Sequence, residues 1–152
     1  MPEQLAKRVI ASLGSDCCVP FNIEKIIRKH GVIIDAASLP PSVNGMFYPG
    51  TPPIIIINKN LHPHRARFTL AHEFYHHLDY TRKPLKPEVR FSHSYVMERR
   101  ANKFAACLLM PEEVLRALLD LGKRPEEVAE ICQVSRQAMQ NRLKELRIAW
   151  ED

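Results

Sequence analysis

The chain has 152 residues, of which 45% are hydrophobic and 26% are charged, and its formal net charge at pH 7 is +5. That length is enough for one packed core and too short for two ordinary domains, so the sequence predicts a single domain over residues 1–152. No apolar run approaches the length of a membrane span, and the run from Ile54 to Ile57 has the length of a strand, which excludes a membrane span and a membrane partner.

Prolines, glycines and caps divide the first part of the chain into two helices and a strand. Gly14 closes the first helix, Asn22 caps the second and Gly31 stops it. Residues 1–22 are thus an N-terminal helix and its linker. The predicted elements are a helix from Leu5 to Leu13, a helix from Ile23 to His30 and a strand from Val32 to Ile34.

Two more strands are predicted on either side of a proline-rich turn. They run from Gly45 to Tyr48 and from Ile54 to Asn58, and residues 49–53 contain three prolines and a glycine. A connection this short favours an antiparallel hairpin. We therefore expect an antiparallel sheet of about three strands.

The rest of the chain is predicted to be mostly helical, which gives an α+β fold class. A helix from Arg65 to Asp79 can turn its apolar side chains to the sheet, and Thr81 to Ser94 is a basic loop, expected to be a solvated connector rather than a lid over a substrate. The residues expected to face the sheet are Phe68, Ala71, Phe74, Tyr75 and Leu78. The later helices run from Val96 to Met110, Pro111 to Leu121, Glu126 to Cys132 and Arg136 to Leu146, the last capped by Ser135.

The helix predicted from Arg65 to Asp79 contains the motif His72-Glu73-Phe74-Tyr75-His76, an H-E-x-x-H element. Histidines four residues apart stand one above the other on the same helix face, so both imidazoles can reach one metal ion with Glu73 beside it. This is the outline of a zinc hydrolase site. The alternative is a solvated His/Glu face on an ordinary helix. The surrounding sequence has to distinguish a metal site from such a face.

A single metal site of this kind needs a third protein ligand and an open position for water. The longer H-E-x-x-H-x-x-G-x-x-H pattern is absent, because Asp79 and Arg82 stand at its Gly and last His positions. A downstream carboxylate is therefore expected. Glu98 is better placed than the others, since it stands near the start of a predicted helix. The other candidates are Asp79, Glu88, Glu112 and Glu113.

Several polar residues could support such a site. Asn102 lies one turn after Glu98 on the same face, where its oxygen can accept a hydrogen bond from a ligand histidine. His93 and Tyr95 precede Glu98 closely enough to enter the cleft as donors to an oxyanion. We expect His77 to be a polar surface residue or a support for a ligand. The histidines expected to be solvated are His30, His62 and His64.

With these residues the chain resembles the ImmA/IrrE family of zinc metallopeptidases. Two separate motifs in the right order are more specific than one, and the resemblance runs from about Ile23 to Leu146. The matching segments are Arg67-Phe68-Thr69-Leu70-Ala71-His72-Glu73-Phe74-Tyr75-His76, Glu98-Arg99-Arg100-Ala101-Asn102-Lys103-Phe104-Ala105-Ala106, Leu108-Leu109-Met110-Pro111, Val134-Ser135-Arg136-Gln137-Ala138-Met139 and Arg142-Leu143.

The resemblance implies a zinc-dependent endopeptidase, with manganese as the alternative metal. It implies His72, His76 and Glu98 as metal ligands and Glu73 as the base. It also implies a protein substrate, a helix-turn-helix transcriptional repressor, whose cleavage derepresses phage, mobile-element or stress genes. The sensor domain that longer family members carry after the helical tail is missing from this sequence, so regulation by such a domain is not implied.

The location that the sequence predicts is the cytoplasm. The four cysteines form no C-x-x-C pair and no small disulfide framework, and the adjacent Cys17 and Cys18 are badly placed to bridge each other. Reduced thiols are typical of the cytoplasm. The N-terminus also lacks the apolar core of a secretion signal.

The last two predicted helices, within residues 125–147, resemble a helix-turn-helix, and the net charge would suit nucleic acid. Ala129, Val134 and Met139 fall where such a motif packs its core. The side chains that would decorate a recognition helix are Arg136, Gln137, Gln140, Asn141, Arg142 and Lys144.

Other residues of this tail oppose a role in DNA binding. Glu126, Glu127 and Glu130 would repel phosphate, and Gln133 stands where the turn often has glycine. We therefore expect the pair to be an integral part of the domain without site-specific DNA binding. The alternative functions are a DNA-binding regulator with a structural zinc, which would favour cysteine ligands, and a partner protein of a toxin or repressor pair.

Overall fold

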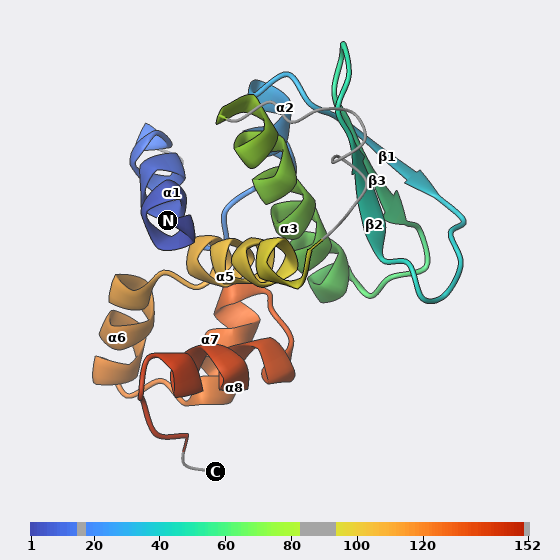
Figure 1. Cartoon of the computed structure of the whole chain (residues 1–152). Helices are drawn as coiled ribbons and strands as arrows, with labels where there is room; N and C mark the ends of the chain where they lie inside the picture. Colours follow the sequence, from blue (N-terminus) through green and yellow to red (C-terminus); the bar gives the residue numbers. More distant parts are fainter. Residues whose placement is uncertain (15–17, 83–93, 151–152) are drawn as a thin grey trace.

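The computed structural model describes residues 1–14, 18–82 and 94–150 (Figure 1). Within these ranges no helix combines the length and apolarity needed to cross a bilayer. The mixture of helices with a small sheet confirms the predicted α+β class. In chain order the elements are α1 Pro2–Ala11, α2 Ile23–Lys29, β1 Ile33–Ala37, β2 Gly45–Tyr48, β3 Ile54–Asn58, α3 Pro63–Arg82, α5 Tyr95–Leu109, α6 Glu112–Asp120, α7 Pro125–Cys132 and α8 Arg136–Glu145.

Most predicted element boundaries are correct to within a few residues, and those of β2 and β3 agree fully. The side-chain oxygen of Asn22 caps α2, because it accepts a hydrogen bond from Lys25 N at 3.1 Å. α1 starts at Pro2, before the predicted start, since proline suits the first turn of a helix. α3 continues to Arg82, so Thr81 and Arg82 are helical rather than part of the predicted loop. Residues 83–93 of that loop lie outside the described ranges.

The sheet is mixed, so the prediction of a wholly antiparallel sheet is wrong. β2 and β3 form the predicted antiparallel hairpin, but β1 lies on the other side of β3 and runs parallel to it. Main-chain pairing carries β1 as far as Ala37, which lies opposite Asn58, and this explains why the strand extends beyond the apolar run. The side chain of Asn58 is buried and donates hydrogen bonds to Leu39 O at 3.2 Å and Val43 O at 3.1 Å. It thereby fixes the connection between β1 and β2.

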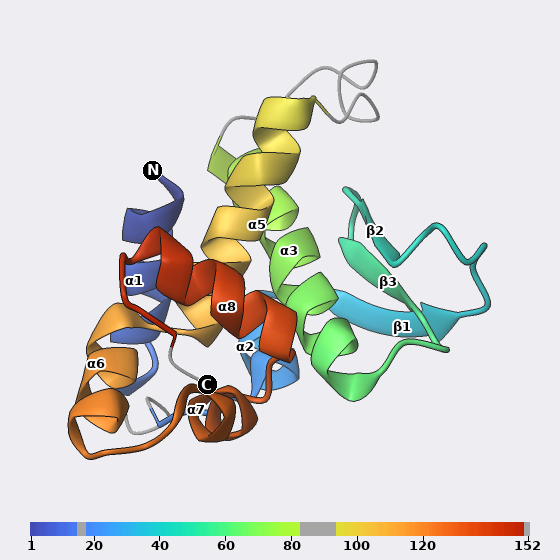
Figure 2. The ribbon, with the colours of Figure 1, turned by 90° about the horizontal axis from the view of Figure 1, so that it is seen from below.

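α3 lies between the sheet on one side and α5 on the other (Figures 1 and 2). Phe74 and Tyr75 of α3, which we expected to face the sheet, instead pack on Phe104 of α5, with ring centroids 6.1 and 5.6 Å away. His77 faces the sheet in their place. Its ring lies 5.6 Å from that of Phe47, and the side chain is buried rather than on the surface. Aromatic side chains of α3 therefore pack against both α5 and the sheet.

Gly45 on β2 lies where the sheet approaches α3 most tightly. A Cβ atom at this position would come within 2.8 Å of Thr69 Cγ2 and 2.9 Å of the carbonyl oxygen of Ile56, and 3.6 Å from Cγ of Glu73. Carbon atoms pack at about 3.5–4.0 Å, so one added methyl group would push β2 away from α3. Glycine at this position therefore sets the spacing between the sheet and the helix that carries the H-E-x-x-H motif.

We predict that Gly45→Ala lowers the free energy of unfolding by about 1–3 kcal/mol, the usual cost of overpacking a tight contact. Urea denaturation of the variant and the wild type measures this cost. Gly50→Ala is the matched control, because a Cβ there has its nearest neighbour at 3.5 Å, an ordinary contact. Equal destabilisation by the two substitutions would contradict the close approach at Gly45.

α7 and α8 form the predicted helix pair and pack into the core of the protein. Ala129, Val134 and Met139 are buried, as the motif requires. The side chain of Ser135 caps α8, since its Oγ accepts a hydrogen bond from Ala138 N at 3.0 Å. Gln133 occupies the turn in the left-handed region, with φ of 55°, which accounts for the usual preference for glycine there.

Two arginines that would decorate a recognition helix are engaged within the protein. Arg142 is buried, and its Nε donates a hydrogen bond to the carbonyl oxygen of Met110 at 3.0 Å while Nη1 pairs with Glu145 at 2.9 Å. The guanidinium of Arg136 stacks 5.3 Å from the ring centroid of Trp150. Since a guanidinium can satisfy a carbonyl at a helix end, Arg142 fastens α8 to the C-terminal end of α5. Arg142 is therefore not available to decorate a recognition helix, which agrees with the expectation that the pair is an integral part of the domain.

Candidate metal centre

α3 and α5 together bring three potential metal ligands to one point. Nε2 of His72 lies 3.0 Å from Oε2 of Glu98, and Nε2 of His76 lies 3.0 Å from Oε1 of the same carboxylate. The two histidine Nε2 atoms are 3.4 Å apart. Among the described residues, this is the group of His, Cys, Asp and Glu side chains whose ligand atoms converge closely enough to hold a metal ion.

Local structure explains how each ligand reaches this point. The histidines are four residues apart on α3, so they lie on one helix face. Glu98 lies in the first turn of α5, which Ser94 caps by accepting a hydrogen bond from Met97 N at 3.2 Å. The packing of Phe74 and Tyr75 on Phe104 holds the two helices together nearly two turns beyond Glu98. Side-chain packing between α3 and α5 therefore places Glu98 over the two histidines.

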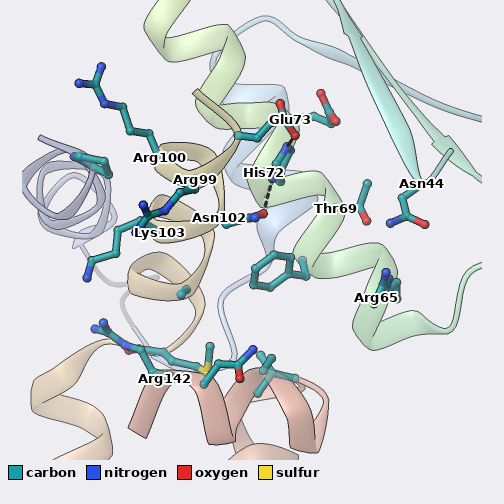
Figure 3. Close-up of a pocket in the computed structure, with 18 of the residues that line it drawn as sticks. Asn44, Arg65, Thr69, His72, Glu73, Arg99, Arg100, Asn102, Lys103 and Arg142 are labelled. Carbon is teal, nitrogen blue, oxygen red and sulfur yellow. Dashed lines mark hydrogen bonds and ion pairs between the residues drawn. The ribbon is translucent and has the colours of Figure 1, made fainter. Parts of the chain in front are cut away.

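Asn102 orients the first of the two histidines. Nδ1 of His72 donates a hydrogen bond to Oδ1 of Asn102 at 2.8 Å, as Figure 3 shows. A neutral imidazole that donates from Nδ1 carries its lone pair at Nε2. This Nε2 faces Glu98 and His76, so the hydrogen bond presents the correct nitrogen to the centre of the group.

The arrangement fits a divalent cation. A lone pair on Nε2 of His72 would repel a carboxylate oxygen 3.0 Å away, unless a proton or a cation lies between them. Zinc ligands at about 2.0–2.1 Å in a tetrahedron are about 3.3 Å apart, close to the spacings of the three side chains. Two imidazole nitrogens and one carboxylate are also the donor set of zinc sites that keep a position open for water.

Glu73 lies beside this group in a buried position. Its side chain is 7% exposed, and among the described residues Oε2 has no hydrogen-bond partner. Burial raises the pKa of Glu73 to about 8, and the nearby charge of Glu98 adds to the effect. A divalent cation held by the three ligands would act in the opposite direction and favour the ionised carboxylate. A buried carboxyl oxygen without a partner is available to a water molecule at this centre.

The remaining predicted site residues lie elsewhere. Tyr95 is 76% exposed, its ring centroid lies 5.7 Å from the guanidinium carbon of Arg99, and the residue does not line the cleft. His93 and Glu88 lie outside the described residues. The other carboxylates that the sequence left open as third ligands do not join the cluster, and Glu112 pairs with Arg116 at 2.9 Å.

His72 and Glu98 line an open cleft of about 1290 Å³, and Glu73 lines it beside them (Figure 3). Arg65 and Thr69 of α3 line it seven and three residues before His72, and Asn44 enters from the connection between β1 and β2. The helical spacing of Arg65 and Thr69 from His72 could have identified them in the sequence. Asn44 carries no such signal, because only the tertiary fold brings it to α3.

We predict that Asn102→Ala weakens zinc binding by about 10- to 100-fold, the usual effect of removing the hydrogen-bond partner of a ligand histidine. Competition with a chromophoric chelator measures the affinity. Asn102→Asp is the matched control, since it keeps an acceptor oxygen for Nδ1 of His72 and should retain most of the affinity. An unchanged affinity in Asn102→Ala would show that this hydrogen bond does not support the site.

Comparison with protein families gives a match over most of the chain. The model of the Peptidase_M78 family, described as the IrrE N-terminal-like domain, matches residues 27–144. This range contains all three converging ligands, all of α7 and all but the last residue of α8, and it agrees with the extent of the resemblance noted in the sequence.

Two individual proteins illustrate the likeness. The radiation response metalloprotease IrrE of Deinococcus radiodurans is 33% identical over 91 residues, which are 54% of this chain and 28% of that protein. A Mycobacterium tuberculosis transcriptional regulator shares the fold with a TM-score of 0.65 and 19% identity, over 94% of this chain and 46% of its own. The chain thus spans less than half the length of either protein.

Proposed function

The chain belongs to the Peptidase_M78 family, the IrrE N-terminal-like domain, and from that membership we propose that it is a zinc-dependent endopeptidase. The observation that carries the proposal is the convergence of His72, His76 and Glu98 beside the buried carboxyl group of Glu73. Manganese is the alternative metal.

In the proposed mechanism each residue of the site has a separate role. His72, His76 and Glu98 would hold the metal, and Asn102 keeps His72 in the tautomer that ligation requires. Zinc held there would supply Lewis acidity, lowering the pKa of water towards about 7 and polarising the scissile carbonyl group. Glu73 accepts the proton of the attacking water and passes it to the leaving nitrogen.

The sheet offers a natural position for the substrate main chain. β3 is paired on both sides, so the free edge of the hairpin is that of β2, which lies against α3 at Gly45, Thr69 and Glu73. An extended segment could add to this edge by main-chain hydrogen bonds. Binding along β2 would bring a peptide bond to the side of the cleft where Glu73 lies.

The substrate that we propose is a helix-turn-helix transcriptional repressor, as the family resemblance implies, with derepression of phage, mobile-element or stress genes as the consequence. The test is incubation of the zinc-loaded protein with the repressor encoded beside its gene, followed by mass spectrometry. We expect cleavage at one or a few bonds, and no cleavage after chelation of the metal. An intact repressor under both conditions would reject this substrate.

A DNA-binding regulator is the second candidate, because α7 and α8 are two short helices joined by a tight turn, as in a helix-turn-helix. The burial of Arg142 and the stacking of Arg136 on Trp150 weigh against it. We predict that the protein binds duplex DNA only weakly and without sequence preference at near-physiological salt, as its net charge of +5 alone would cause.

Selection from a random duplex library at two salt concentrations tests this prediction. Arg136→Ala with Lys144→Ala is the appropriate variant, because both residues are exposed, whereas Arg142 is buried. Each base contact of a recognition helix contributes roughly 1–3 kcal/mol of discrimination. Enrichment of one sequence by the wild type, lost in the variant, would favour the DNA-binding function instead.

A further inference from the structure

α8 forms one wall of the cleft that contains the metal ligands. Gln137, Ala138 and Asn141 of this helix line the same cleft as His72 and Glu73. In a DNA-binding helix pair, the corresponding second helix would enter the major groove. Here part of its exposed surface is turned towards the site of the proposed chemistry, where it can contact a bound substrate.

Buried side chains and polar contacts with neighbouring helices hold α8 firmly in place. Met139 and Leu143 are fully or nearly fully buried, and the side chain of Arg142 bonds to the carbonyl oxygen of Met110. At the C-terminal end of the helix Glu145 pairs with Lys103 of α5, which also lies 3.6 Å from Glu3 of α1. These contacts join α8 to two other helices. The wall of the cleft is therefore rigid, and its side chains can be placed accurately against a ligand.

The exposed side chains on this wall carry the same hydrogen-bonding groups as a peptide bond, an N–H donor and a C=O acceptor. Gln137 and Asn141 are exposed carboxamides one helical turn apart, and Nε2 of Gln137 donates to Oδ1 of Asn141 at 2.9 Å. A carboxamide has two N–H donors and an acceptor oxygen, so each side chain retains further hydrogen-bonding capacity after this contact. Donor and acceptor pairs of this kind match the N–H and C=O groups of an extended main chain.

The length of α5 sets the distance between the metal ligands and this wall. Asn102 contacts His72, and Met110, eight residues later, contacts Arg142 of α8. Eight residues of helix span about 12 Å, at about 1.5 Å per residue. Figure 3 shows His72 and Arg142 towards opposite ends of the cleft. Since an extended chain covers about 3.3 Å per residue, about four substrate residues would separate the scissile bond from α8.

We propose that Gln137 and Asn141 on α8 bind the main chain of an extended substrate segment about four residues from the scissile bond. The enzyme would then select long, unstructured segments of a protein and discriminate against short peptides. This inference rests on the proposed peptidase function. It also gives α8 a use that does not involve nucleic acid.

The probe is a pool of random 12-residue peptides, cleaved by the zinc-loaded protein and analysed by mass spectrometry to locate the scissile bonds. One cleaved peptide is resynthesised and then shortened from each end to two residues from that bond. For the full peptide, Gln137→Ala combined with Asn141→Ala should raise KM about tenfold with kcat unchanged, as expected when ground-state hydrogen bonds are lost. Shortening the side that reaches α8 should raise the wild-type KM similarly and remove the difference between wild type and variant.

Gln140→Ala is the matched control, because it removes the same amide group from the same helix at a position that does not line the cleft. Its KM should equal that of the wild type. Urea denaturation should give one midpoint for the wild type and the double variant, since both substituted residues are exposed.

The outcomes separate this inference from the proposed function. A zinc-loaded wild type that cleaves neither the peptide pool nor the repressor would reject the peptidase function, and with it this role of α8. Cleavage by the wild type with an unchanged KM in the double variant, at every peptide length, would reject the α8 inference alone. Loss of duplex DNA binding in the double variant, without a change in KM, would assign this face to nucleic acid instead.

Discussion

Glu73→Gln is expected to lower the rate of peptide-bond cleavage by roughly 10²- to 10⁴-fold while zinc content and fold remain as in the wild type. The factor is the usual contribution of a general base. Glutamine is nearly isosteric with glutamate but cannot accept the proton of the attacking water. Glutamine also keeps the size of this buried side chain, and among the described residues Oε2 of Glu73 has no hydrogen-bond partner that the substitution would remove. The substitution should therefore leave the packing unchanged.

The measurements are single-turnover cleavage of the repressor, elemental analysis of bound zinc, and the urea midpoint. Glu113→Gln is the matched control, because it makes the same chemical change on α6, outside the metal cluster and the cleft. The control should cleave at the wild-type rate. A Glu73→Gln protein that binds zinc and cleaves within a factor of a few of the wild type would remove Glu73 from the mechanism.

The placement of the site residues could be predicted from the sequence wherever one helix determines it. The i, i+4 spacing of His72 and His76 places both rings on one face whatever the rest of the fold does. Asn102 follows Glu98 by the same rule, and the structure indeed places it against His72. Which of the five candidate carboxylates is the third ligand depends on how α5 packs on α3. The spacing of residues along the sequence does not determine that packing.

The features that the sequence did not predict depend on tertiary contacts. The direction of β1 depends on the path of residues 38–44, which carries the chain past β3 to its other side. Arg142 has the charge of a surface residue, but the carbonyl group at the end of α5 and Glu145 stabilise it in a buried position. Tyr95 is close to Glu98 in sequence, yet its place at the start of α5 directs it to solvent. Short sequence distance did not predict proximity in space.

Loss of zinc is the second large effect that we expect, in His76→Ala and in Glu98→Ala. The wild type should carry about one zinc per chain, because three protein ligands converge and a fourth position remains for water. Removal of His76 or Glu98 leaves two ligands, too few for a stable site of this type. Elemental analysis after dialysis should therefore show most of the metal lost from both variants, a larger effect than the weakened affinity expected for Asn102→Ala. Peptide cleavage should fall with the metal content.

Two control variants distinguish the loss of a metal ligand from a general loss of structure. Glu112→Ala and Asp79→Ala are the matched controls, since both residues were alternative third ligands in the sequence and neither belongs to the converging group of described residues. Both controls should retain full zinc. If Glu98→Ala keeps its zinc while Asp79→Ala or Glu112→Ala loses it, the third ligand is one of those carboxylates. If His76→Ala and Glu98→Ala both retain full zinc, the metal is bound elsewhere. In either case the site derived from α3 and α5 would be wrong.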